Sequence, residues 1–188
     1  MKKLTTKQQD FIKNIIDEGL SHAAQSLSSI TNRSFHVHFT ALSDSNLIIN
    51  FYDKDELFVL ISDLHGEIKG KSLFILTKKQ AEQIWGLLIP NSNNSEMREA
   101  ILLEIDNIVT ASVVTKLASA LKKKMYAGVP AMEIKDKDAL QKSILAYLSD
   151  DAIELTSTTL LQADNLSISP TFIWIFSQDF ISATETHA

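Results

Sequence analysis

A glutamate and an asparagine three residues apart, Glu104 and Asn107, are the side chains of this sequence best placed to act together. They lie in a long stretch with apolar residues at helical spacing, and a three-residue offset puts both on one helix face, one turn apart. One turn before and after them on that face are Ala100 and Ala111, so no bulky side chain keeps another protein's backbone away. The pattern predicts a shallow docking surface with one carboxylate and one carboxamide.

The pair belongs to a longer pattern. Glu104-Ile-Asp-Asn107 is followed, after twenty-two intervening residues, by Pro130 at the entrance of a predicted strand. This arrangement resembles the signature of the CheC/CheX/FliY family of bacterial chemotaxis phosphatases, in which Glu, Asn and Pro stand at the same spacing after an initial Asp or Ser. The initial position differs here, because Ala100 occupies it.

The resemblance implies a chemical role for each member of the pair. Members of the family remove the phosphoryl group from the aspartyl-phosphate of the response regulator CheY. Hydrolysis needs a water in line with the acyl phosphate and charge neutralisation, which the regulator's own Mg²⁺ and lysine supply. Asn107 can accept from and donate to that water, and Glu104 can hold the lysine by a charge-assisted hydrogen bond. The resemblance thus implies a CheY-like partner and no metal or cofactor of the protein's own.

A second interpretation stays open. The same fold can serve as a non-catalytic binding or regulatory module that docks a signalling partner, or as a component similar to the FliY relatives at the flagellar switch. Ala100 at the first signature position favours this alternative. The oligomeric state is open too: a single-site CheX relative suggests a homodimer, whereas the two-copy length resembles the monomeric CheC arrangement.

The chain also resembles itself. A shift of ninety residues places Asn14–Leu27 over Glu104–Leu117, which predicts two copies of one supersecondary unit. The first copy has diverged from the signature, because Asn14, Asp17 and Thr40 stand where the family has Glu, Asn and Pro. A single site in the second half is therefore predicted, and a second site at Asn14 and Asp17 is the alternative.

Helical and strand patterns follow one another in the same order in both halves. We expect long helices over about 5–29 and 96–125, short helices over 79–88 and 138–148, and strands over 35–42, 47–52, 57–63, 72–76, 131–134, 153–163 and 168–176. This order predicts an α+β fold in which each half is a long helix followed by mainly antiparallel strands, as in CheC. The halves are about 5–78 and 95–177 of a single domain, 1–188, and 179–188 is predicted to be a loose tail.

Composition narrows the function classes. The chain has 188 residues, a net charge of −5 and no cysteine, which excludes disulfides, thiolate metal sites and a cysteine nucleophile. Its one basic run, Lys122–Lys124, is too short for a nucleic-acid interface. No apolar run approaches the roughly eighteen residues of a membrane span, and no signal peptide is evident, so a cytoplasmic location without membrane insertion is expected. Phosphate-binding glycine loops, nucleophile elbows and HExxH motifs are absent.

Two histidines of one predicted strand raise a further possibility. His36 and His38 are two residues apart, so both project from one face, as a pair of Zn²⁺ or Cu²⁺ ligands could. No third ligand accompanies them, and a solvent-facing pair is the favoured interpretation. His22, in the apolar stretch of the first helix, is expected to be packed and hydrogen-bonded, and Trp85 and Trp174 to lie in the core or an interface.

Overall fold

The computed structural model describes residues 4–43, 56–148 and 152–185. The elements in chain order are α1 (Thr6–Thr31), β1 (Phe35–Ser43), β2 (Leu57–Gly66), β3 (Gly70–Thr77), α2 (Lys78–Leu88), α3 (Ser95–Leu121), β4 (Met125–Ala127), β5 (Ala131–Lys135), α4 (Lys137–Tyr147), β6 (Ile153–Ala163), β7 (Leu166–Ile168), β8 (Thr171–Phe176) and α5 (Asp179–Glu185). The strand predicted over 47–52 lies outside the described residues.

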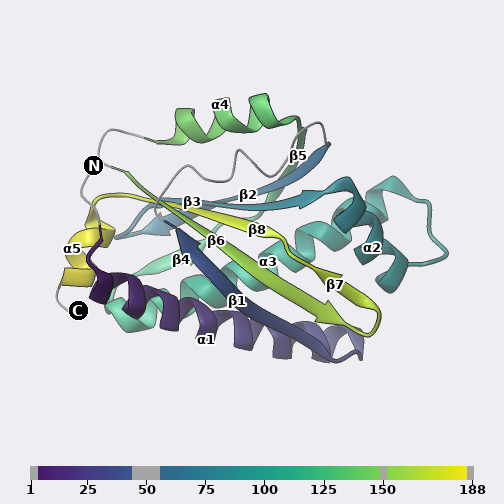
Figure 1. Ribbon diagram of the computed structural model, residues 1–188, viewed down its shortest axis with the longest axis horizontal. Coiled ribbons are helices and arrows are strands. Elements are labelled where there is room, and N and C mark those ends of the chain that lie inside the picture. The colour runs from purple at the N-terminus through teal and green to yellow at the C-terminus, as the bar shows by residue number, and fades with distance from the viewer. Residues whose placement is uncertain (1–3, 44–55, 149–151, 186–188) are drawn as a thin grey trace.

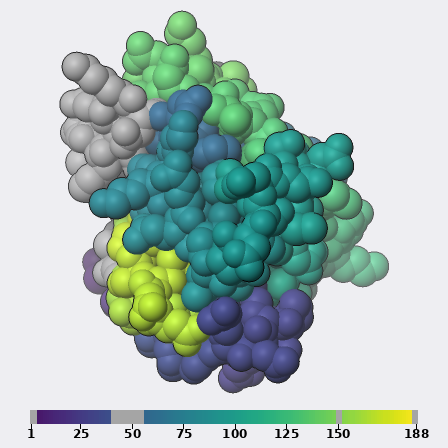
Figure 2. Space-filling view, turned by 90° about the vertical axis from the view of Figure 1, so that its right-hand side faces the viewer, coloured from purple at the N-terminus to yellow at the C-terminus, as the bar shows by residue number. Residues whose placement is uncertain are grey.

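The strands form one antiparallel sheet in the order β1-β6-β8-β3-β2-β4, in which β5 also pairs with β2 and β7 with β6. Helices α1 and α3 cover one face of the sheet, and α4 lies on the other (Figure 1). The main core is formed between the sheet and the two long helices, and a smaller core lies beneath α4, where Leu140 and Ile144 are buried. Figure 2 shows α2 and the adjoining end of α3 between α4 above and α1 below.

The sheet has an approximate two-fold symmetry. Reading its strands from the opposite edge gives the same order, once each strand is replaced by its counterpart from the other half of the chain. Under this exchange β1 corresponds to β4 and β5, β6 to β2, and β8 to β3. Leu73 pairs with Ile173 at the centre of the sheet. The flanking pairs are reciprocal, as a two-fold axis through that centre requires: Ser72 with Trp174, and Phe74 with Phe172. This symmetry supports the internal repeat that the sequence predicts.

The edge strands carry matching irregularities. The pairing of β1 shifts register between Phe39 and Ala41. Ninety residues later, β4 and β5 are separate pieces that both pair with β2, and Pro130 directly precedes the second piece. Proline has no N–H to donate to a strand ladder. Thr40 and Pro130 thus mark equivalent interruptions at opposite edges.

The two long helices approach each other closely near their midpoints. His22 Nδ1 of α1 lies 3.4 Å from Ser112 Oγ of α3, and these residues are ninety positions apart, which places their contact near the symmetry axis. The predicted hydrogen-bonding contact of His22 is thus present, but the residue is exposed, so the prediction that it is packed is wrong. A Cβ on Gly19 would stand 2.6 Å from Val113 Cα. Glycine is therefore required here for the close approach of the two backbones.

Replacing Gly19 by alanine is expected to lower the free energy of unfolding by about 1–3 kcal/mol, because the new methyl group meets backbone that cannot move aside without separating α1 from α3. Gly86 in α2 is the matched control, since a Cβ there meets nothing within 4 Å. Gly86→Ala should raise stability by about 0.5–1 kcal/mol through helix propensity. Urea unfolding of both variants measures the contrast, and equal effects would contradict the packing argument.

The start of α1 agrees with prediction and the end of α3 does not. Thr5 caps α1 in a capping box with Gln8, a pattern visible in the sequence. We predicted that α3 would continue to about Met125, with termination by the later glycine and proline. It ends at Leu121, because Lys122 adopts the left-handed conformation with φ 53°, and Met125 begins β4.

The C-terminal segment is ordered, and the predicted loose tail is wrong over 179–185. Helix α5 buries Phe180, Ile181 and Ala183, and Phe180 stacks on Phe176 of β8 with ring centroids 4.1 Å apart. Gln8 Nε2 of α1 also donates to Thr184 Oγ1 at 3.0 Å. The apolar side chains hold this short helix against the core, where it closes the end of the sheet. We also predicted one strand over 168–176, and Pro170 divides it into β7 and β8.

Candidate functional site

Glu104 and Asn107 are both exposed on α3. Their three-residue spacing puts them on one face, about 4.5 Å apart along the helix axis. Among the described residues, neither side chain has a hydrogen-bond or ion-pair partner, so both are available to another molecule. Ala100, one turn before the pair, is exposed too, and Ala111, one turn after it, is half-buried. The predicted surface of small residues around a carboxylate and a carboxamide is therefore present on α3.

The beginning of α3 is held in place by contacts to α2 and the preceding loop. Asn94 caps the helix by accepting from the backbone N–H of Met97. Trp85 of α2 donates its indole N–H to the backbone oxygen of Arg98 at 2.9 Å, and the Arg98 guanidinium lies over the Trp85 ring. Trp85 packs edge-on against Phe58 of β2. The turns that precede the pair are therefore fixed to the sheet through α2.

Asp106 lies between the members of the pair in sequence and on the opposite side of the helix. It is fully buried. Oδ2 accepts a hydrogen bond from Ser62 Oγ of β2, and Oδ1 accepts one from Thr110 Oγ1 of α3, both at 3.0 Å. Thr110 Oγ1 also lies 3.3 Å from Ser72 Oγ of β3. Burial raises the pKa of the Asp106 carboxyl to about 7, against the lowering effect of the hydrogen bonds from Ser62 and Thr110.

Our interpretation of the sequence missed Asp106 because an aspartate beside exposed polar residues resembles part of the solvent face. Its spacing carried the signal: Leu102 is four residues before it and Val109 three after it, and both are buried. Ile101 and Ile108 are apolar but only half-buried, so apolar spacing alone does not mark the limits of the buried face of α3.

Pro130 and Ala100, the other two signature positions, differ in what they can contribute. Pro130 is half-buried and ends the interruption between β4 and β5 on the edge strand, so its role is in the backbone. Ala100 has no polar group to replace the carboxylate or hydroxyl of the family signature. Of the four signature positions, Glu104 and Asn107 are therefore the two that carry polar side chains.

The equivalent positions of the first half are also at the surface. Asn14 and Asp17 are both exposed on α1, one turn apart. Amide and carboxylate stand in the opposite order from the pair on α3. The residues of α1 at the positions of Asp106 and Thr110 are Ile16 and Leu20, which are buried apolar side chains. The polar network beneath the α3 pair has no counterpart at these helix positions.

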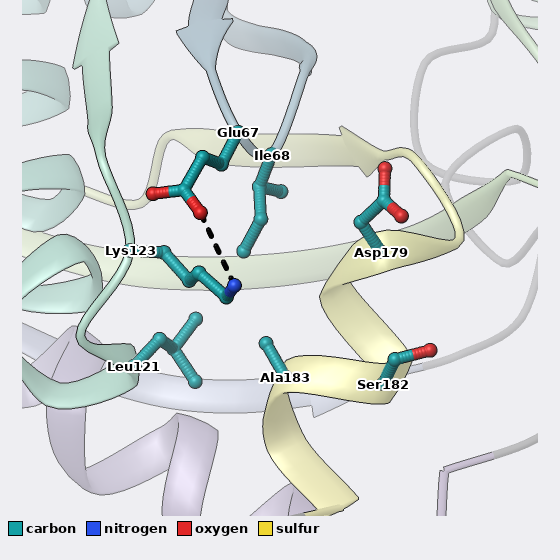
Figure 3. A pocket seen from close by; sticks show the side chains of 7 residues that line it. All are labelled: Glu67, Ile68, Leu121, Lys123, Asp179, Ser182 and Ala183. Atoms are coloured by element: carbon teal, nitrogen blue, oxygen red, sulfur yellow. Dashed lines mark hydrogen bonds and ion pairs between the residues drawn. The ribbon is translucent and has the colours of Figure 1, made fainter.

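The hollow of about 470 Å³ shown in Figure 3 lies between the C-terminal end of α3, the β2–β3 turn and α5. Its charged groups are partly satisfied by each other, since Lys123 Nζ donates to Glu67 at 3.2 Å. The backbone N–H of Lys124, followed by the contact with Lys123, lowers the pKa of Glu67. Leu121 lines this hollow, fourteen residues beyond Asn107, or about 21 Å along the helix. The hollow is thus separate from the exposed pair.

The histidines of β1 form a surface pair. His36 and His38 are exposed and their rings stack with centroids 6.2 Å apart. No group of three or more metal-ligating side chains occurs within the part of the chain that the structure describes. Over residues 4–43, 56–148 and 152–185, no helix is long and apolar enough to cross a membrane.

Comparison with known proteins identifies the fold. No protein-family profile matches the chain, and no curated protein matches it in sequence. The architecture is of the CheC/CheX/FliY type, as the sequence predicts, and this confirms the α+β fold class. FliY of Thermotoga maritima superposes with a TM-score of 0.78 at 19% identity, over 98% of this chain and 97% of that one.

Two structures of complexes also contain this fold. A chain of the FliG–FliM complex from H. pylori superposes with a TM-score of 0.68 at 12% identity, over 95% of this chain and 100% of that chain. A chain of the CheX–CheY–BeF3–Mg²⁺ complex from Borrelia burgdorferi gives a TM-score of 0.55 at 16% identity, over 87% of this chain and 98% of that one. One fold therefore occurs in complexes with different partners.

Proposed function

We propose that this protein is a phosphatase for the aspartyl-phosphate of a CheY-like response regulator in chemotaxis or another two-component pathway. The observation that carries the proposal is the exposure of Glu104 and Asn107, one turn apart and without partners in the described residues, on α3 of this fold. A regulator carries its aspartyl-phosphate among its own loops, so a catalytic group must approach from outside. An exposed pair on a convex helix suits that approach, whereas an enclosed pocket does not.

Asn107 has the chemistry needed to orient the attacking water. Its carboxamide can accept one hydrogen bond from the water and donate another without itself changing charge. The water oxygen bonds to phosphorus, the bond from phosphorus to the aspartyl oxygen breaks, and inorganic phosphate and free aspartate result. The regulator's Mg²⁺ and lysine stabilise the charge on the transferring group. Asn107 thus fixes the position and orientation of the water, and such positioning can account for a large part of the lowering of the activation barrier.

Glu104 serves as the docking contact for the regulator's lysine. A carboxylate one turn from the carboxamide fixes how the two proteins meet, because a charge-assisted hydrogen bond is both short and directional. Glu96 and Glu99 are also exposed on the N-terminal half of α3. These acidic groups favour the approach of a basic site, and Glu104 alone among them shares a face with Asn107 one turn away.

The direct test is phosphate release from a phosphorylated CheY-like regulator, measured with and without the protein. Replacing Glu104 by lysine should weaken binding to the regulator at least about tenfold and lower turnover, because a repelling charge replaces the lysine's partner. Glu99→Lys is the control, since it makes the same charge change on a different face. Equal losses of binding affinity in both variants would show that Glu104 acts only through its negative charge and makes no specific contact with the regulator's lysine.

A non-catalytic docking module is the second candidate function, and two observations favour it. The TM-score to the FliG–FliM complex exceeds that to the CheX–CheY complex, and Ala100 lacks the first polar group of the signature. Phosphate release no faster than the regulator's spontaneous rate, together with measurable binding of a regulator or a switch protein, would favour this candidate.

A further inference from the structure

The polar network of Asp106 ties one short segment of α3 to two adjacent strands. Asp106 bonds to Ser62 of β2, and Thr110, one turn along the same helix face, reaches Ser72 of β3. All four side chains are at most 1% exposed and lie within the main core. The helix segment held in this way is the segment whose outer side carries Glu104 and Asn107.

The two halves of the chain differ at the positions of this network, so the fold itself does not require polar side chains there. Where α3 has Asp106 and Thr110, α1 has Ile16 and Leu20, and Phe172 of β8 takes the position of Ser72. The first half packs this part of its helix with apolar side chains, which shows that the fold accepts hydrophobic residues at these helix positions. The polar version occurs in the half that carries the Glu-x-x-Asn pair.

Hydrogen bonds and apolar contacts constrain a helix differently. Apolar packing is non-directional, so a helix can turn or slide slightly with little loss of buried area. A rotation of α3 that moved Asp106 away from Ser62 would leave a buried carboxyl without its donor, which is far more costly. The raised pKa of Asp106 agrees with a buried carboxyl whose hydrogen bonds do not fully compensate for desolvation. Such a group contributes orientation more than stability.

We propose that Asp106 is a positioning residue, which through Ser62 and Thr110 holds α3 at one rotation on the sheet and so keeps Glu104 and Asn107 facing outward together. The structural part of this inference stands on the network alone. Its consequence for turnover rests on the proposed phosphatase function.

Three variants separate positioning from stability. The triple change Ser62→Ala, Asp106→Ile and Thr110→Leu replaces the polar anchor with the kind of side chains that α1 uses. It removes a buried carboxyl, which offsets the loss of Thr110 as the partner of the Ser72 hydroxyl, so the protein is expected to fold with undiminished stability. Asp106→Asn is the conservative variant: its carboxamide can accept from one hydroxyl and donate to the other, which hydroxyl groups accommodate by rotation. Ser157→Ala is the control, because it removes a different buried hydroxyl, the partner of the Trp174 indole N–H.

The orientation of α3 can be measured without any enzymatic assay. Thr115 on α3 and Lys69 in the β2–β3 turn are both exposed. Because the chain has no cysteine, a protein with Thr115→Cys and Lys69→Cys can be spin-labelled at these two positions without background. In the unsubstituted protein, Asp106→Asn and Ser157→Ala, we expect one narrow distance distribution. In the triple variant we expect a broadened or shifted distribution at undiminished unfolding free energy.

Turnover then tests the functional consequence. In the triple variant kcat should fall about tenfold to a hundredfold with little change in KM, because a displacement of about 1 Å suffices for such losses, while Asp106→Asn retains activity. A narrow, unshifted distribution in the triple variant would overturn the inference, whatever its activity. A broadened distribution in a protein that releases no phosphate even when unsubstituted would uphold positioning by Asp106 and reject the phosphatase.

Discussion

Replacing Asn107 by alanine is expected to slow dephosphorylation by about two to three orders of magnitude, the scale seen when one preorganised polar group is removed from a reaction centre. The loss follows from the task assigned to the carboxamide, because alanine leaves the attacking water without a group that orients it. Binding of the regulator should stay nearly unchanged, since Asn107 contacts the water in the transition state and Glu104 provides the docking contact.

Asp17→Ala is the matched control. Asp17 occupies the equivalent position on α1, is also exposed, and belongs to the copy that has lost the signature. Rapid mixing with phosphorylated regulator measures turnover, and titration with a regulator that carries an unreactive phosphoryl mimic measures binding. A comparable loss of turnover in Asp17→Ala would instead identify α1 as a second site. Unchanged turnover in Asn107→Ala would reject the role of the carboxamide.

Replacing Asp106 by asparagine is expected to change how stability depends on pH. The carboxyl has a pKa of about 7 in the folded protein against an ordinary value of 3.8, so the folded state holds the proton more tightly than the unfolded state. The contribution of Asp106 is therefore fully present below about pH 4 and is lost as the pH rises to about 7. Each pH unit in this window lowers the free energy of unfolding by about 1.4 kcal/mol relative to the asparagine variant, or about 4 kcal/mol in all.

Urea unfolding of both proteins at pH 4.5, 6 and 8 measures this difference. Ser62 of β2 and Thr110 of α3 donate to Asp106, and Ser72 of β3 contacts Thr110; none of these hydroxyl groups titrates in the window. Burial also raises the pKa of Glu154, against a smaller lowering by Thr156, but Glu154 is common to both proteins and cancels in the difference. The exposed change Asp17→Asn should follow the unsubstituted protein throughout. Parallel curves for Asp106→Asn and the unsubstituted protein would show that Asp106 is ionised equally in both states.

Local signals in the sequence predicted most of the fold. Thr5 with Gln8 specifies the start of α1, and runs of apolar and β-branched residues place β2 and β6 within a few residues. Prediction failed where tertiary contacts decide the outcome. Lys122 ends α3 in a left-handed conformation more typical of glycine, and Phe180 in the short helix α5 is ordered by packing on Phe176. Neither effect follows from the propensity of the residue itself.

In the candidate site, too, local spacing predicted some features, whereas tertiary contacts decide others. Helical spacing predicts that Glu104 and Asn107 share a face, and their exposure agrees with it. Helical spacing also places Asp106 on the buried face with Leu102 and Val109. The spacing does not show why a carboxyl is tolerated there, because one of the two hydroxyl groups that bond to it comes from Ser62, far earlier in the chain, and the other from Thr110. Burial of a carboxyl depends on partners that only the folded sheet supplies.

The pairing of β1 with β6 affects how the protein folds as it is synthesised. Phe35 pairs with Ala163 and Leu42 with Ser157, so β1 leaves the ribosome with its neighbouring strand not yet made. About 120 further residues must be added, which takes roughly 6–24 s at ~5–20 residues per second. During that interval the edge of β1 that pairs with β6 remains uncovered. Truncated chains that lack β6 should therefore aggregate or be bound by chaperones, and neither half is expected to fold alone.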